Sequence, residues 1–174
     1  PGKKKPKPYA LIHTTQIGGA ALAWILAREI KDSKEGLELV AIGTIADQLP
    51  LVGANRSFAK YGLETLNTTA RVGLKALFSE AGIVKGGIGT YEVGFIIGPR
   101  INASGRIDDP MDPLRLLCLK KDLPRAREIS LKLDQNNRER QELTQSTTLV
   151  ARESWLKEKS ESKLIFVYDA SFNE

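Results

Sequence analysis

The sequence is poor in the residues that build many catalytic and structural sites, because its 174 residues include a single cysteine, Cys118, and a single histidine, His13. One cysteine cannot form a disulfide within the chain and is typical of a reducing compartment, so we expect a cytoplasmic protein. A zinc site of cysteines and histidines is excluded by the same counts. Cys118 lies in the apolar stretch 116–119, which predicts a small core residue rather than a nucleophile.

Long apolar segments are also absent. No run approaches the roughly 20 apolar residues of a membrane-spanning helix, and the basic, proline-rich stretch 1–8 is not followed by a signal-peptide core. We therefore expect neither a membrane protein nor a secreted one. Walker and nucleophile-elbow motifs are missing. The formal net charge of +5 permits a polyanionic partner without identifying one.

The apolar pattern predicts an α/β protein. Residues 37–45 form a nearly continuous, partly β-branched apolar run, which is typical of a strand buried on both faces of a parallel sheet. Residues 163–168 predict a terminal strand. The expected helices cover residues 18–31, 55–66, 72–81 (ending at a C′ glycine, Gly82), 90–97 (capped by Thr90 and broken or bent at Gly98-Pro99) and 112–119.

The stretch 123–159 predicts one long helix, because it contains neither glycine nor proline beyond its first turn. Opposite charges four residues apart support this helix. The pairs are Glu128–Lys132 and Asp134–Arg138. A helix this long and polar is typical of a connector between domains or of a coiled-coil arm. The expected parts are a basic end at 1–8, a domain at 9–122, the connector helix at 123–160 and the start of another domain at 161–174.

The first candidate site is Asp47, which follows the apolar run 37–45 and precedes Pro50. A carboxylate placed directly after a buried strand stands at the carboxyl edge of the sheet, where α/β proteins bind ligands. Asp47 can therefore coordinate a divalent metal through oxygen. It can also shape the turn before Pro50, and the residues alone leave both roles open.

The second candidate site is a segment in which Arg100, Asn102 and Arg106 lie among small residues. The planar fork of an arginine suits phosphate oxygens, and an asparagine can bind a phosphate or a base edge. The alternative is a solvated loop in which the arginines pair with Asp108 and Asp109. The glycines of stretch 13–19 precede an expected helix and can hold an anion there, but the pattern is weak and a tight turn is the plainer interpretation.

Several of these stretches together resemble the RecJ-type exonucleases of the DHH phosphoesterase superfamily. Residues 43–51 (GTIADQLPL) and 99–106 (PRINASGR) resemble two short motifs of that family, in the same order. Asn55-Arg56 follows the first motif as in the family, residues 136–140 match its "N..R" run, and residues 17–30 are similar to the helix after its DHH signature. The resemblance covers essentially the whole chain.

The resemblance also implies parts that this chain lacks. The DHH signature, the earlier aspartate motifs and the glycine-rich motif of the DHHA1 domain are missing from the sequence. We therefore expect an internal part of a longer protein. Residues 9–122 would be the carboxyl-terminal part of a DHH-type parallel-sheet domain, and residues 161–174 the start of a DHHA1-like domain.

For the whole protein, the resemblance implies a 5′-to-3′ exonuclease of single-stranded DNA that acts in DNA repair and recombination with two Mn²⁺ or Mg²⁺ ions. Asp47 would be a metal ligand and catalytic residue, while most other ligands would lie outside this chain. Arg100, Asn102 and Arg106, and with less support Arg56, would bind phosphate. The alternatives are an inert RecJ-like scaffold for replication or repair proteins, and a DHH phosphodiesterase acting on short RNA or cyclic dinucleotides.

Overall fold

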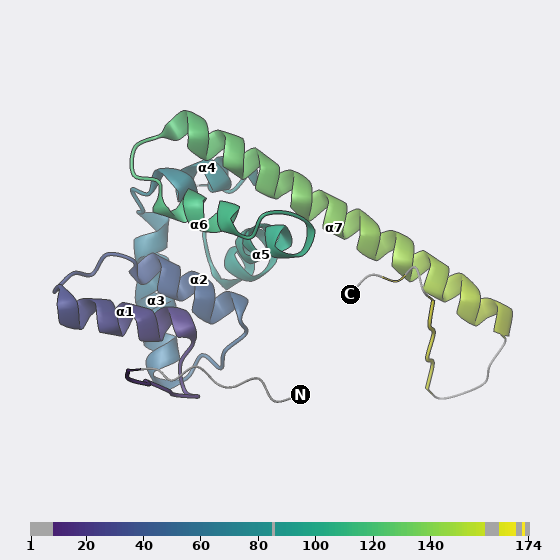
Figure 1. Ribbon diagram of the computed structural model, residues 1–174, viewed down its shortest axis with the longest axis horizontal. Coiled ribbons are helices and arrows are strands. Elements are labelled where there is room, and N and C mark those ends of the chain that lie inside the picture. The colour runs from purple at the N-terminus through teal and green to yellow at the C-terminus, as the bar shows by residue number, and fades with distance from the viewer. Residues whose placement is uncertain (1–8, 85, 159–163, 170–171, 173–174) are drawn as a thin grey trace. The chain divides into compact units, whose positions relative to one another are not determined.

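The structure is a computed structural model that describes residues 9–84, 86–158, 164–169 and 172. Within these residues the chain is helical and contains no strand. It divides into two compact units, residues 1–66 and residues 67–174. The elements are α1 (Gly19–Ile30), α2 (Leu37–Ala46), α3 (Gly53–Asn67), α4 (Val72–Glu80), the π-helix η1 (Glu92–Ile97), α5 (Gly98–Ile107), α6 (Met111–Cys118) and α7 (Leu123–Glu158), as labelled in Figure 1. None of the described helices is long and apolar enough to cross a membrane.

Helix α2 replaces the strand that the sequence predicts over residues 37–45, so that prediction is wrong and the parallel sheet is not confirmed. The run is apolar on nearly every side, and such a pattern fits a buried helix as well as a buried strand. Gly36 precedes the helix with a φ of +90°, a left-handed conformation that glycine adopts easily. Val40 and Ala41 are almost completely buried.

The first unit is held together by close approaches between small residues. A Cβ atom on Gly62 of α3 would lie 2.5 Å from the Cβ of Ala41. A Cβ on Gly43 would lie 2.9 Å from the Cβ of Ala20 in α1. The helix axes can therefore approach closely only because these positions lack side chains. Trp24 of α1 and Phe58 of α3 add an edge-to-face contact with ring centroids 6.0 Å apart.

The second unit is organised around α7, which packs against α4, α5 and α6 (Figure 1). The long helix predicted from the sequence is confirmed, with 36 residues. Ala126, Ile129 and Leu133 are buried at helical spacing, whereas the second half of α7 is largely exposed. Only the first half of the helix therefore contributes to the core of this unit.

The sequence predicts a break or a bend at Gly98-Pro99, and the break is wrong. Helical geometry runs from residue 90 through η1 into α5. A proline inside an α-helix removes one hydrogen bond and crowds the carbonyl four residues earlier. The wider π-helical turns of η1 precede Pro99 and accommodate it, and the guanidinium of Arg100 donates to the Ile96 carbonyl oxygen at 2.9 Å. The Glu92 carboxylate, rather than Thr90, caps the start by accepting the Gly89 N–H at 2.7 Å.

Three further local predictions have mixed outcomes. Gly82 ends α4 as predicted, with a φ of +66° and the hydrogen bonds of a Schellman motif, Ile83 N–H to the Phe78 carbonyl and Gly82 N–H to the Ser79 carbonyl. Cys118 is exposed rather than in the core, because it lies on a different side of α6 from the buried Leu116. Residues 164–168 form no strand, since an extended segment needs a partner for its backbone groups. The remaining residue of that prediction, 163, lies outside the described residues.

Candidate functional site

Asp47 lies at the end of α2 rather than at the end of a strand, and it is exposed. Its backbone N–H still donates to the Gly43 carbonyl, so Asp47 closes the last helical turn. Gln48 then adopts a φ of +54°, which is uncommon for a residue with a side chain. The N–H of Leu49 returns to the Thr44 carbonyl at 3.2 Å. The Asp47 carboxylate is thus presented at a tightly turned, strained point of the chain.

Asn55, in the first turn of α3, contacts this turn. Its side-chain amide donates to the carbonyl oxygens of Pro50 at 3.1 Å and of Gln16 at 3.0 Å. The sequence indicated Asn55 only as a neighbour of Arg56, because hydrogen bonds between distant segments leave no local pattern. Arg56 itself is exposed on α3.

Arg100 lies on helix α5 rather than in the loop that the sequence predicts, and its guanidinium faces the buried Asp134 of α7. Nε and Nη2 of Arg100 both lie 2.8 Å from Asp134 Oδ1, while Nε of Arg138 lies 2.7 Å from Oδ2. The Asp134 side chain is 1% exposed and that of Arg100 is 16% exposed. The prediction that Asp134 pairs with Arg138 is confirmed, whereas Arg100 does not pair with the acidic residues that follow α5.

Asn102, the second predicted phosphate ligand, is exposed on α5. Arg106 belongs to the same helix, but its side chain lies outside the described residues. Ser104, between them, is buried, and its hydroxyl accepts a hydrogen bond at 3.2 Å from the side-chain amide of Asn136 on α7. The helix therefore has one side bonded to α7 and another that leaves Asn102 accessible.

A group of charges surrounds the start of α6, which we call the α6 charge network. Its members are Asp108, Asp109, Asp112, Arg115 and Lys132. Lys132 of α7 lies 2.7 Å from both Asp108 and Asp112, and this interaction is the main cause that lowers the pKa of those two carboxyls. The pKa of Asp109 is lowered by the Met111 backbone N–H and then by Arg115. The hydrogen bonds that Lys132 donates to Asp108 and Asp112 raise its own pKa. Lys132 therefore does not form the helical pair with Glu128 that the sequence predicts; Glu128 accepts from Arg125 instead.

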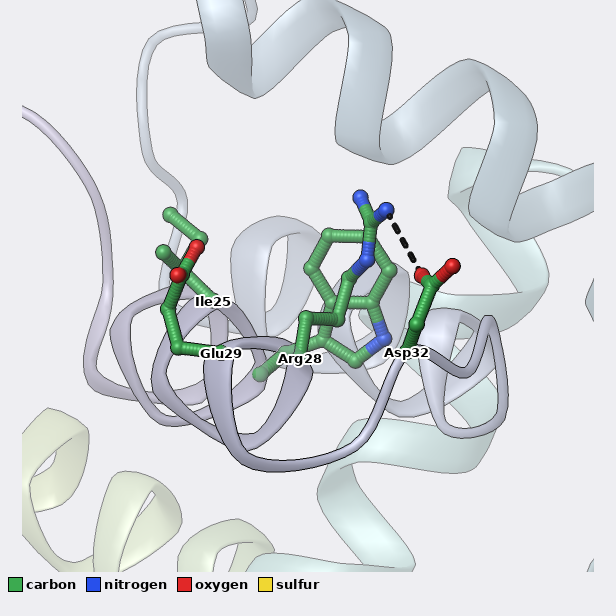
Figure 2. Close-up of a pocket in the computed structure, with 5 residues that line it drawn as sticks. Ile25, Arg28, Glu29 and Asp32 are labelled. Carbon is green, nitrogen blue, oxygen red and sulfur yellow. Dashed lines mark hydrogen bonds and ion pairs between the residues drawn. The ribbon is translucent and has the colours of Figure 1, made fainter.

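A surface pocket of about 260 Å³ lies along α1 and is lined by Trp24, Ile25, Arg28, Glu29 and Asp32. Figure 2 shows Arg28 linked to Asp32, at 3.3 Å. The guanidinium of Arg28 also stands 5.0 Å from the centre of the Trp24 ring. The Arg28 guanidinium in this pocket is already paired with the Asp32 carboxylate and the Trp24 ring, so the pocket indicates no particular class of ligand. None of the predicted site residues lines it.

Comparison with curated proteins and solved structures identifies the family of the chain, although no protein-family model matches it. The single-stranded-DNA-specific exonuclease RecJ of Bacillus subtilis is 37% identical over 186 residues, covering 99% of this chain and 23% of that protein. The RecJ of Thermus thermophilus is 33% identical and covers 84% of this chain. The chain is a RecJ-type segment of the DHH superfamily. The crystal structure of the T. thermophilus RecJ in complex with Mn²⁺ agrees, with a TM-score of 0.64 and 33% identity over 77% of this chain and 20% of that one.

The RecJ-type chain spans about a quarter or less of the length of the curated relatives it matches. The similar T. thermophilus structures are complexes with Mn²⁺ and with Mg²⁺. In the part of this chain that the structure describes, no three His, Cys, Asp or Glu side chains are grouped so that they could hold a metal ion.

Proposed function

We propose that this chain is part of a 5′-to-3′ exonuclease that hydrolyses phosphodiester bonds of single-stranded DNA in DNA repair and recombination. The observation that carries the proposal is an exposed carboxylate, Asp47, held at a strained turn within a segment that matches RecJ along almost its whole length. The RecJ relatives are single-stranded-DNA-specific exonucleases by name. Single-stranded DNA is thus the partner that the similarity favours.

Asp47 is the residue we propose as a metal ligand and catalytic residue. A carboxylate oxygen is the donor type that Mg²⁺ and Mn²⁺ prefer, and the exposure of Asp47 leaves it accessible. No three-residue cluster of such ligands occurs among the described residues, so the proposal requires other residues to supply the remaining ligands. When bound, two such ions would activate the attacking water and stabilise the leaving oxygen.

The phosphate-binding role is proposed for Arg100, Asn102, Arg106 and Arg56. Asn102 and Arg56 are exposed and can reach a polyanion. Arg100 is held in one orientation by Asp134 and the Ile96 carbonyl, so any remaining N–H donors would be preorganised for a phosphate oxygen. Its low exposure makes it the weakest of these candidates, and a structural role is established by its contacts.

A chimera tests the role of Asp47. Residues 1–174 would replace the aligned segment of the B. subtilis RecJ, and digestion of labelled single-stranded DNA would be followed with Mn²⁺. We expect Asp47→Asn to abolish digestion, because the amide cannot replace a charged oxygen ligand. Asp32→Asn is the matched control, since Asp32 is an exposed aspartate just beyond the end of α1. Full activity of the Asp47→Asn chimera would remove Asp47 from the site.

The isolated chain should lack nuclease activity but bind single-stranded DNA weakly. Binding should fall as salt rises, because cationic side chains release counterions from the nucleic acid. Arg56→Ala and Arg106→Ala should each weaken binding and reduce its salt dependence, whereas Arg152→Ala, on the exposed half of α7, should have less effect. Fluorescence anisotropy across a salt series measures this. Equal losses in all three variants would indicate general attraction rather than defined phosphate contacts.

Two other functions remain as alternatives. A scaffold that binds replication or repair proteins would need no metal, and an active chimera that depends on Asp47 would argue against it. A DHH phosphodiesterase would prefer short RNA or cyclic dinucleotides. Digestion of substrates of increasing length by the full-length protein separates that activity from an exonuclease acting on long single strands.

A further inference from the structure

Asn55 is a buried polar side chain that joins two segments far apart in the sequence. It is 5% exposed and lies inside the unit formed by residues 1–66. Its Nδ2 atom donates to the carbonyl oxygen of Gln16, in the segment before α1, and to that of Pro50, in the turn after Asp47. One amide group therefore holds both segments against the start of α3.

The two carbonyls explain why an asparagine stands here. Both partners are acceptors, so the position needs two N–H donors on one short side chain, which an amide supplies and a carboxylate cannot. The Asn55 Oδ1 atom is buried and has no hydrogen-bond partner among the described residues. The donors of Asn55, rather than its oxygen, therefore account for its place in the core.

The Pro50 carbonyl lies at the end of residues 47–50, which we call the Asp47 turn. It also accepts the Val52 N–H at 2.9 Å, while the N–H groups of Gln48 and Leu49 donate back to α2. The segment before α1 meets the same turn at a second point, because a Cβ on Gly18 would lie 3.0 Å from the Leu49 side chain. The turn is thus fixed by α2 on one side and by Asn55 on the other.

We propose that Asn55 is a positioning residue that fixes the Asp47 turn and thereby the direction in which the Asp47 carboxylate is presented. This inference rests on the proposed role of Asp47 as a metal ligand. The Asp47 side chain is exposed, so the conformation of its backbone sets the direction in which that side chain leaves the chain. Mutation of a group that orients a metal ligand without binding the metal itself lowers metal affinity or activity by roughly 10- to 100-fold.

Amide hydrogen exchange of the 174-residue chain tests the positioning directly. In Asn55→Asp, which is isosteric but loses both donors, we expect the Leu49 and Val52 amides to exchange at least about tenfold faster, as local opening becomes easier. The amides in the middle of α3 should keep their protection. Asn67→Asp is the matched control, because Asn67 also binds a backbone segment, through the N–H and carbonyl of Ile88, in the other unit. Unchanged exchange at Leu49 and Val52 would overturn the proposal, as would equal loss throughout α3.

Metal dependence in the B. subtilis chimera tests the consequence. Asn55→Asp should raise the Mn²⁺ concentration for half-maximal digestion by roughly 10- to 100-fold and leave the KM for single-stranded DNA nearly unchanged. Asn67→Asp should not alter the Mn²⁺ requirement. An Asn55→Asp chimera that behaves as wild type in Mn²⁺, while Asp47→Asn is inactive, would overturn the positioning role and leave the proposed function intact. Faster exchange at the turn together with an active Asp47→Asn chimera would refute the proposed function instead.

Discussion

The contact between Arg100 and Asp134 allows a prediction whose size follows from burial. Replacing Arg100 with methionine keeps the apolar stem and removes the guanidinium. Asp134, with a side chain that is 1% exposed, would then keep Arg138 as its one charged partner among the described residues. A buried carboxylate that loses its main partner is left incompletely compensated in a medium that solvates it poorly.

The expected loss for Arg100→Met is about 3–5 kcal/mol, the range for breaking a buried ion pair from one side. Arg138→Met removes a bond of similar length, 2.7 Å, but the Arg138 side chain is 71% exposed. Solvent screening limits such a pair to about 0–1 kcal/mol. Replacing both partners, in Arg100→Met with Asp134→Leu, should recover most of the loss because no buried charge is left without a partner.

Native-state hydrogen exchange of the α7 amides between residues 126 and 137 is the assay, since a chain of two units need not unfold in a single step. The predicted loss corresponds to exchange that is about a hundredfold to a few thousandfold faster, at 1.4 kcal/mol for each factor of ten. The reasoning is refuted if Arg100→Met and Arg138→Met have equal effects. A double variant less stable than Arg100→Met would refute it as well.

Two further predictions concern each unit separately. The carboxyls of the α6 charge network have a lowered pKa, so their stabilisation is present above about pH 4 and should be lost as the pH falls below that. The raised pKa of Lys132 places the opposite limit above about pH 10.5, where its stabilisation is lost on deprotonation. Urea midpoints followed by circular dichroism across pH should show a smaller loss of stability at both pH limits in Lys132→Met than in the wild type. An unchanged profile would contradict this. In the first unit, Gly62→Ala would press a methyl group onto Ala41 and should cost about 1–3 kcal/mol. Gly19→Ala, with nothing within 4 Å of the new Cβ, is the control, and equal melting temperatures of the two variants would disprove the close-packing argument.

Features that depend on neighbours along the chain could be predicted from the sequence. Helix α7 is an example, because its length follows from an uninterrupted helical composition and its backbone hydrogen bonds join residues four apart along the chain. The end of α4 at Gly82 is another, since a Schellman motif needs only a glycine at the right place. The position of Asp47 in a turn before Pro50 also followed from local residues, whichever element came before it.

Features that depend on partners far along the chain were decided by the tertiary structure. Residues 37–46 are apolar on nearly every side, so only their neighbours in space determine that they form a helix rather than a strand. The residues around Arg100 left open whether it binds phosphate or pairs with Asp108 and Asp109, and neither pattern indicated Asp134, 34 residues later, which accepts its hydrogen bonds. Asn55 has the same origin, because its two carbonyl partners lie in separate segments. A side chain's donors and acceptors can be read from the sequence, but the atoms that satisfy them in a buried place are set by how the helices pack.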